Sequence, residues 1–134
     1  MSYRVKNTLF CVSALILGAA MYIIFRPKAV VSMFFGKICW VSDLQILLQS
    51  VSADCLRYYL SDLLWAFSLS CGLQAIFVPD QHGIVICAGT AAVCGVFWEL
   101  LQLFGMVQGT GDWVDGVMYF FAAIASILIN QRRQ

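Results

Sequence analysis

The segment Thr8–Phe25 reads TLFCVSALILGAAMYIIF and contains no charged side chain. A helix of about 20 mostly apolar residues crosses the roughly 30 Å hydrocarbon core of a bilayer, so this run is long enough for a membrane span. Basic residues flank it on both sides, as is typical of the two membrane interfaces: Arg4, Lys6, Arg26 and Lys28. A cleaved secretory signal is the alternative, but such signals have apolar runs of only about 7 to 15 residues. We therefore expect a retained span.

The composition of the whole chain agrees with a membrane location. Its 134 residues are 62% hydrophobic and 11% charged, with a mean hydropathy of +0.87. Soluble domains carry roughly 25% charged residues, so a soluble globule is excluded. The length supports one domain. A net charge of +1 provides no basic field for a phosphate backbone, so we expect no nucleic-acid partner.

We expect an all-α fold: a polytopic membrane helix bundle with four transmembrane helices plus an interfacial amphipathic helix, forming a single transmembrane domain over residues 1–134. The spans are predicted at about residues 8–26, 59–78, 83–105 and 112–130. Pro79 to Gly83 read PDQHG, a turn that makes the second and third spans an antiparallel hairpin.

The segment at about residues 29–54 is the predicted interfacial part. Between Trp40 and Ala53, polar residues recur on one helical face and apolar residues fill the other, which is typical of a helix lying at the membrane surface. The polar residues are Ser42, Gln45, Gln49 and Ser52. With four spans, both termini lie on one side of the membrane, and we expect that side to be the cytoplasm.

Cysteine and histidine positions do not predict a metal centre. No Cys-x-x-Cys pair is present, most of the six cysteines fall inside predicted spans, and the lone His82 sits in the turn. The sequence also has no nucleophile elbow, phosphate loop or zinc-protease signature. We therefore expect no cofactor, and the identity of any bound metal stays open.

Acidic residues are predicted to gather at one side of the membrane. Because the spans alternate in direction, the start of the second, the end of the third and the start of the fourth lie together, and these positions hold Asp62, Glu99, Asp112 and Asp115. On the fourth span the acids continue a stripe through Tyr119, Ala122 and Ser126, and on the third Glu99 follows Ala92 and Gly95 and precedes Gln102. Small residues on such stripes let helices approach, so both stripes should face the bundle interior.

Each acid also has a purely structural interpretation. Asp62, Asp112 and Asp115 lie at helix starts, where carboxylates cap free N–H groups. Glu99 lies near a helix C-terminus, where the dipole opposes negative charge, and an acid inside a span costs about 2.5 to 3.5 kcal/mol. A salt bridge with Arg57 or Lys37, a hydrogen bond with Gln102, or a polar pocket that binds a cation, a cationic lipid headgroup or a proton would each offset this cost.

Two motifs resemble the signature of the VanZ-like family of small bacterial integral membrane proteins. The first is Phe97–Phe104 with its E-x-x-Q at Glu99 and Gln102, followed by the polar loop, Asp112, Asp115 and Tyr119; the second is the D-x-x-W of Asp62 and Trp65. The resemblance implies a multi-pass protein of the bacterial cytoplasmic membrane, associated with the cell envelope and linked to glycopeptide antibiotic tolerance. The polar loop here lacks the Arg usual in that family.

The leading hypothesis is an acidic pocket that binds a polar or cationic group, such as a lipid or lipid-linked envelope precursor. Its candidate ligand-binding residues are Glu99, Gln102, Asp112, Asp115, Tyr119, Asp62 and Trp65. One alternative is a small structural or accessory subunit that engages a larger membrane protein. The other is a metal-assisted lipid-modifying enzyme; enzymatic activity stays open, with a non-enzymatic function favoured.

Overall fold

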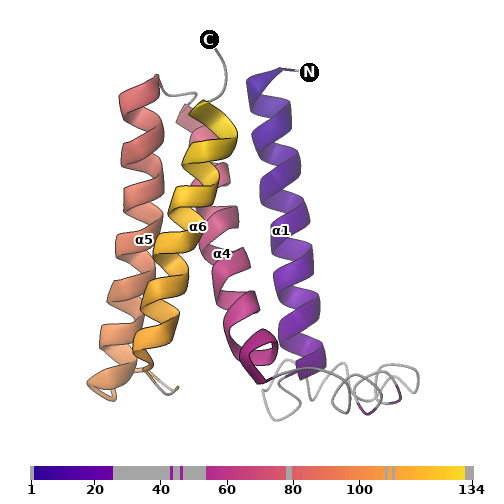
Figure 1. The fold of residues 1–134 in the computed structure, drawn as a ribbon, viewed down its shortest axis with the longest axis vertical. Helices are drawn as coiled ribbons and strands as arrows, with labels where there is room; N and C mark the ends of the chain where they lie inside the picture. The colour runs from indigo at the N-terminus through magenta and orange to yellow at the C-terminus, as the bar shows by residue number, and fades with distance from the viewer. Residues whose placement is uncertain are drawn as a thin grey trace.

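The computed structural model describes residues 2–25, 43, 46, 54–77, 80–107, 109 and 111–131. Within these ranges the chain is helical and has no strand. The four long helices are α1 (Tyr3–Phe25), α4 (Asp54–Phe77), α5 (Gln81–Leu103) and α6 (Trp113–Gln131) (Figure 1). Each contains a stretch long and apolar enough to cross a membrane. The predicted all-α membrane helix bundle with four spans is therefore confirmed.

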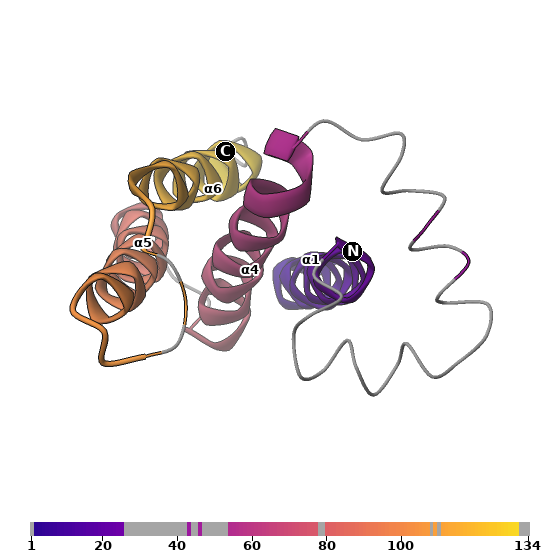
Figure 2. The same ribbon diagram turned by 90° about the horizontal axis from the view of Figure 1, so that it is seen from below.

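Helix α4 is the central element of the bundle. It packs against α1 on one side and against α5 and α6 on the other, while α5 and α6 also pack together (Figure 2). The start of α1, the end of α4, the start of α5 and the end of α6 lie at the same end of the bundle (Figure 1). The opposite end holds the start of α4, the end of α5 and the start of α6. This alternation brings the predicted acidic positions to one end.

Local sequence explains where α5 begins and ends. Asp80 is its N-cap, and the side chain accepts a hydrogen bond of 2.8 Å from the backbone N–H of Gly83. At the other end, Gly105 has a φ of +68°, in the left-handed region that favours glycine. This conformation lets the N–H of Met106 donate to the carbonyl of Leu101, which closes the helix end.

Small side chains form the centre of the contact between α4, α5 and α6. The buried cluster consists of Ala66, Ala88, Ala92, Tyr119, Ala122 and Ala123. Alanines allow helix backbones to approach closely, which is how membrane helices gain packing energy where lipid is as apolar as leucine. Large apolar side chains such as Ile16, Val93 and Phe120 are exposed on the outside, where a bilayer would cover them.

The predicted interfacial helix lies almost wholly outside the described residues. Of the segment Trp40–Ala53, only Asp43 and Ile46 are described; both are helical and exposed. Lys37, one of the predicted partners of Glu99, also lies outside, as does the side chain of Arg57.

Candidate functional site

Glu99 lies near the end of α5, buried to 6% exposure against the start of α6. The hydroxyl of Tyr119 donates a hydrogen bond of 2.9 Å to its Oε1, and the backbone N–H of Asp112 donates one of 3.2 Å to its Oε2. Both carboxylate oxygens therefore have donors from α6 or the residue preceding it. These two donors offset the cost that the helix dipole and the membrane impose on this acid.

Asp112 connects the same site to α4. The hydroxyl of Tyr59 donates a hydrogen bond of 3.0 Å to Asp112 Oδ2, while the backbone N–H of Val114 donates one of 3.1 Å to Oδ1. The second bond is that of a helix N-cap, as the structural interpretation of Asp112 expects. The first bond adds a contact between helices. Glu99, Asp112, Tyr59 and Tyr119, which we call the acid cluster, thus joins α4, α5 and α6.

Two further predicted residues lie beside the acid cluster. Asp115 is buried to 8% exposure, one helical turn before Tyr119. Asp62 is partly buried on α4, and both carboxyls are close enough to interact electrostatically with the Tyr119 phenol. The four acids therefore lie at one end of the bundle, as the alternating direction of the spans predicts: Asp62, Glu99, Asp112 and Asp115.

Gly95 creates the space in which Tyr119 packs. A Cβ at Gly95 would lie 2.5 Å from the Tyr119 ring, well inside van der Waals contact. The glycine therefore lets the ring lie directly against the α5 backbone, and the phenol then extends along α5 to Glu99. The predicted small-residue stripe on α5 serves this close approach.

Gln102 and Trp65 are placed differently. Gln102 lies against the loop backbone, where a Cβ at Gly109 would be 2.6 Å from Gln102 Cδ. Its amide thus packs on Gly109, and the described donors to Glu99 come from Tyr119 and Asp112 instead. Trp65 is 46% exposed and lies next to Gly18 of α1. It belongs to the α1–α4 contact.

A small cavity of about 40 Å³ adjoins the acid cluster. Its lining surface is mostly apolar, and its lining residues are Val96, Glu99, Leu100, Leu103, Asp112, Trp113 and Gly116. Trp113 is 81% exposed at the start of α6. Because a single water needs roughly 10 to 15 Å³ of such space, the cavity accommodates one small polar group but not a whole lipid headgroup.

The described ranges contain no group of three or more His, Cys, Asp or Glu side chains arranged to hold a metal ion. The described donors to Glu99 and Asp112 are two phenols and two backbone N–H groups, all of them neutral. Geometry in this part of the chain thus gives no support to a metal-assisted enzyme.

Sequence reasoning does not identify Tyr59 as a site residue. Tyr59 begins the apolar part of α4, one turn before Asp62, and its position resembles that of an ordinary interfacial aromatic. An available signal is its spacing of three residues from Asp62, which places the two on one helical face.

A second polar network, at the opposite end of the bundle, is also absent from the sequence-based prediction. The Asn130 amide nitrogen donates to Gln74 Oε1 at 2.7 Å and to Asn7 Oδ1 at 3.0 Å. The hydroxyls of Ser70 and Ser126 are 2.6 Å apart, and Lys6 Nζ donates to Asn130 Oδ1 at 3.2 Å. We call this set the amide network. Its sequence signal is the i, i+4 pairing of Ser70 with Gln74 and of Ser126 with Asn130.

Comparison of the chain with protein-family models, with curated proteins and with solved structures finds no match.

Proposed function

We propose that the cavity beside Glu99 and Asp112 binds a small cationic group, such as the primary ammonium of a membrane lipid or of a lipid-linked envelope precursor. The observation that carries this proposal is that two acidic residues, Glu99 and Asp112, are among the residues that line a 40 Å³ space, while the described hydrogen-bond donors to their carboxyl groups are all neutral. A cation in this space supplies the countercharge that neutral donors do not. An ammonium also matches the volume.

The exposed Trp113 ring supports a headgroup at this position. It lines the same cavity at the start of α6, and indoles are enriched where the hydrocarbon core meets the headgroups. An aromatic face next to an acidic pocket favours a cation by charge and by the ring quadrupole. The lipid tail would then extend along the outside of α5 and α6.

Lipid retention by the purified protein tests this function. Native mass spectrometry after equilibration with phosphatidylethanolamine and phosphatidylglycerol of identical tails reports which headgroup is retained. We expect the wild type to retain phosphatidylethanolamine selectively and Glu99→Gln and Asp112→Asn to lose that selectivity. Asp80→Asn is the matched control, because it neutralises an exposed acid at the opposite end while preserving a capping side chain. Equal retention of both headgroups by the wild type would refute the proposal.

A structural role is the second candidate, and one observation favours it. Both oxygens of Glu99 accept hydrogen bonds within the protein, as a carboxylate that only locks helices together would. In that case Glu99→Gln lowers the stability of the bundle, in parallel with any change in lipid retention. A binding site instead loses headgroup selectivity to a degree that does not follow the change in unfolding midpoint.

From the motif resemblance we also propose a cellular location and role. The protein would be a VanZ-like protein of the bacterial cytoplasmic membrane that acts at the cell envelope, with both termini in the cytoplasm. Glu99, Gln102, Asp112 and Asp115 occupy the motif positions. Expression in a sensitive bacterial host should raise tolerance of teicoplanin, and Glu99→Gln should remove the gain. If the wild-type protein is present in the host membrane and teicoplanin tolerance does not change, the proposed link to glycopeptide tolerance is wrong.

A further inference from the structure

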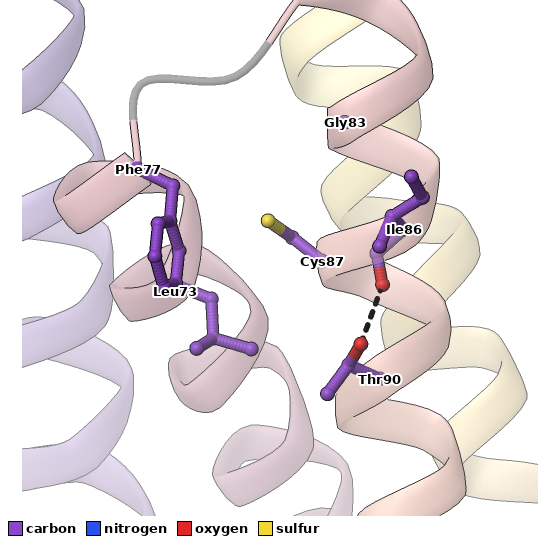
Figure 3. Close-up of a pocket in the computed structure, with 6 residues that line it drawn as sticks. All are labelled: Leu73, Phe77, Gly83, Ile86, Cys87 and Thr90. Carbon is purple, nitrogen blue, oxygen red and sulfur yellow. Dashed lines mark hydrogen bonds between the residues drawn. The ribbon is translucent and has the colours of Figure 1, made fainter.

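A larger cavity, of about 310 Å³, lies between the end of α4 and the beginning of α5. Its lining residues are Leu73, Phe77, Gly83, Ile86, Cys87 and Thr90 (Figure 3). Gly83 and Glu99 are sixteen positions apart on α5, which corresponds to about 24 Å along the helix. The cavity is therefore independent of the acid cluster and lies toward the other membrane interface.

The space arises from unequal side-chain sizes on the two facing helices. Gly83, Cys87 and Thr90 follow one another at i, i+4 and i+7, so that α5 presents a face of small side chains toward α4. The α4 wall consists of Leu73 and Phe77, one turn apart, and Cys87 points into the gap between the helices in Figure 3.

The lining indicates an apolar occupant. The Thr90 hydroxyl donates a hydrogen bond of 2.8 Å to the carbonyl of Ile86, so it is already satisfied within α5. The Cys87 thiol is a weak donor, and the other lining side chains are hydrocarbon. A polar ligand would lose its hydrogen bonds to water here without replacement, which disfavours its binding.

The cavity is continuous with the surface that the spans present to the bilayer. Phe77 and Ile86, which line it, are 68% and 67% exposed. Both belong to helices long and apolar enough to cross the membrane, so their exposed faces meet acyl chains. The occupant that reaches this cavity from its open side is thus a lipid tail.

The depth of the cavity matches one leaflet. Thr90 lies ten residues beyond the N-cap Asp80, or about 15 Å along α5, which is half of the roughly 30 Å hydrocarbon thickness. We propose that the cavity between α4 and α5 holds one acyl chain of a membrane lipid, taken from the leaflet on the side of the chain termini and retained independently of its headgroup.

Filling the cavity tests this site. Cys87→Phe places a ring in the space, and Cys94→Phe makes the same change at an exposed position of the same helix. Thr90→Leu is a second filling variant at an exposed residue, which keeps the test valid if Cys87→Phe does not fold. The full-length proteins are delipidated gradually in detergent with phosphatidylethanolamine and phosphatidylglycerol of the same tails, and retained lipid is counted by native mass spectrometry.

We expect the wild type and Cys94→Phe to retain one lipid of either headgroup at this site, and the filled variants to retain one lipid fewer. Equal counts in wild type and Thr90→Leu would overturn the proposal. So would retention at this site that depends on the headgroup, because a tail site does not discriminate between headgroups. Loss of phosphatidylethanolamine selectivity in Glu99→Gln, by contrast, concerns only the acid cluster.

Discussion

Replacing Gly95 with alanine tests whether the close contact between α5 and Tyr119 holds the acid cluster in place. The added methyl carbon would lie 2.5 Å from two Tyr119 ring atoms and 2.8 Å from a third. The ring must retreat by about 1 Å to reach an ordinary carbon–carbon separation of about 3.5 Å. That movement lengthens the 2.9 Å bond between the Tyr119 hydroxyl and Glu99 beyond hydrogen-bonding distance.

The expected decrease in the free energy of unfolding combines two destabilising contributions and one stabilising contribution. Overpacking costs about 1 to 3 kcal/mol, and the lost interhelical hydrogen bond adds about 0.6 kcal/mol. The better helix propensity of alanine returns up to about 1 kcal/mol. Gly95→Ala should therefore lower the free energy of unfolding by roughly 0.6 to 3.6 kcal/mol. Gly89→Ala is the matched control, because a Cβ there would meet no described side chain or neighbouring helix within 4 Å, and only the propensity gain remains.

Reversible unfolding in mixed micelles titrated with sodium dodecyl sulfate, followed by circular dichroism, measures both variants. Combining Gly95→Ala with Tyr119→Leu removes the ring that meets the new methyl, so the double loss should be smaller than the sum of the single losses. If Gly95→Ala is as stable as Gly89→Ala, the packing of Tyr119 against α5 is not what positions the phenol.

Three further substitutions test the hydrogen bonds, with Ser13→Ala on the exposed side of α1 as a control near zero. Tyr119→Phe removes one donor to Glu99 and should lower unfolding stability by about 0.6 to 1.7 kcal/mol, measured in the same micelle titration. Asn130→Leu leaves Asn7 Oδ1 without its described donor and removes one of the two described donors to Gln74 Oε1, so it should cost about 1 to 3 kcal/mol, with stability equal to the Ser13→Ala control contradicting the expectation. Lys6→Met removes a donor to the last carbonyls of α6 and should cost about 0.3 to 1 kcal/mol, visible as faster hydrogen exchange at that helix end; unchanged exchange would count against it.

The period of the α-helix is enough to predict much of the acid cluster from the sequence. Asp115 and Tyr119 are one turn apart, so any helix over this segment places them on one face, and the alternating chain direction puts Glu99 at the same end. Gly95 marks the face of α5 that approaches its neighbour most closely. These relations need only the rise and period of a helix.

The period does not decide which neighbour each face of α4 meets. Because α4 packs against three helices, most of its circumference is covered, and the spacing that joins Asp62 to Trp65 does not distinguish the α1 side from the α6 side. Trp65 consequently lies beside Gly18 rather than in the acid cluster, while Tyr59 takes the position next to Asp112. The rotation of α4 depends on packing between helices far apart in the sequence.

The amide network is unpredictable for a related reason. Helix α1 is apolar on nearly all sides, so its sequence does not indicate which face packs inward, and the partners of Asn7 depend on that face. Once that face packs inward, the buried Asn7 amide needs hydrogen-bond partners, because burying an amide in the membrane without them has a large free-energy cost.

The two polar ends of the bundle therefore differ in what they require. In the amide network, the Asn130 side-chain N–H groups donate to the side-chain oxygens of Asn7 and Gln74, and the Lys6 ammonium donates to acceptors at the end of α6. Such a network is complete within the protein and needs no ligand. The carboxyl groups of Glu99 and Asp112 accept hydrogen bonds only from neutral described donors, and both residues line a cavity. Because neutral donors do not balance a negative charge, a cation in that cavity would be favourable. The difference in formal charge between the two ends, more than their burial, is what makes the acid cluster the candidate for function.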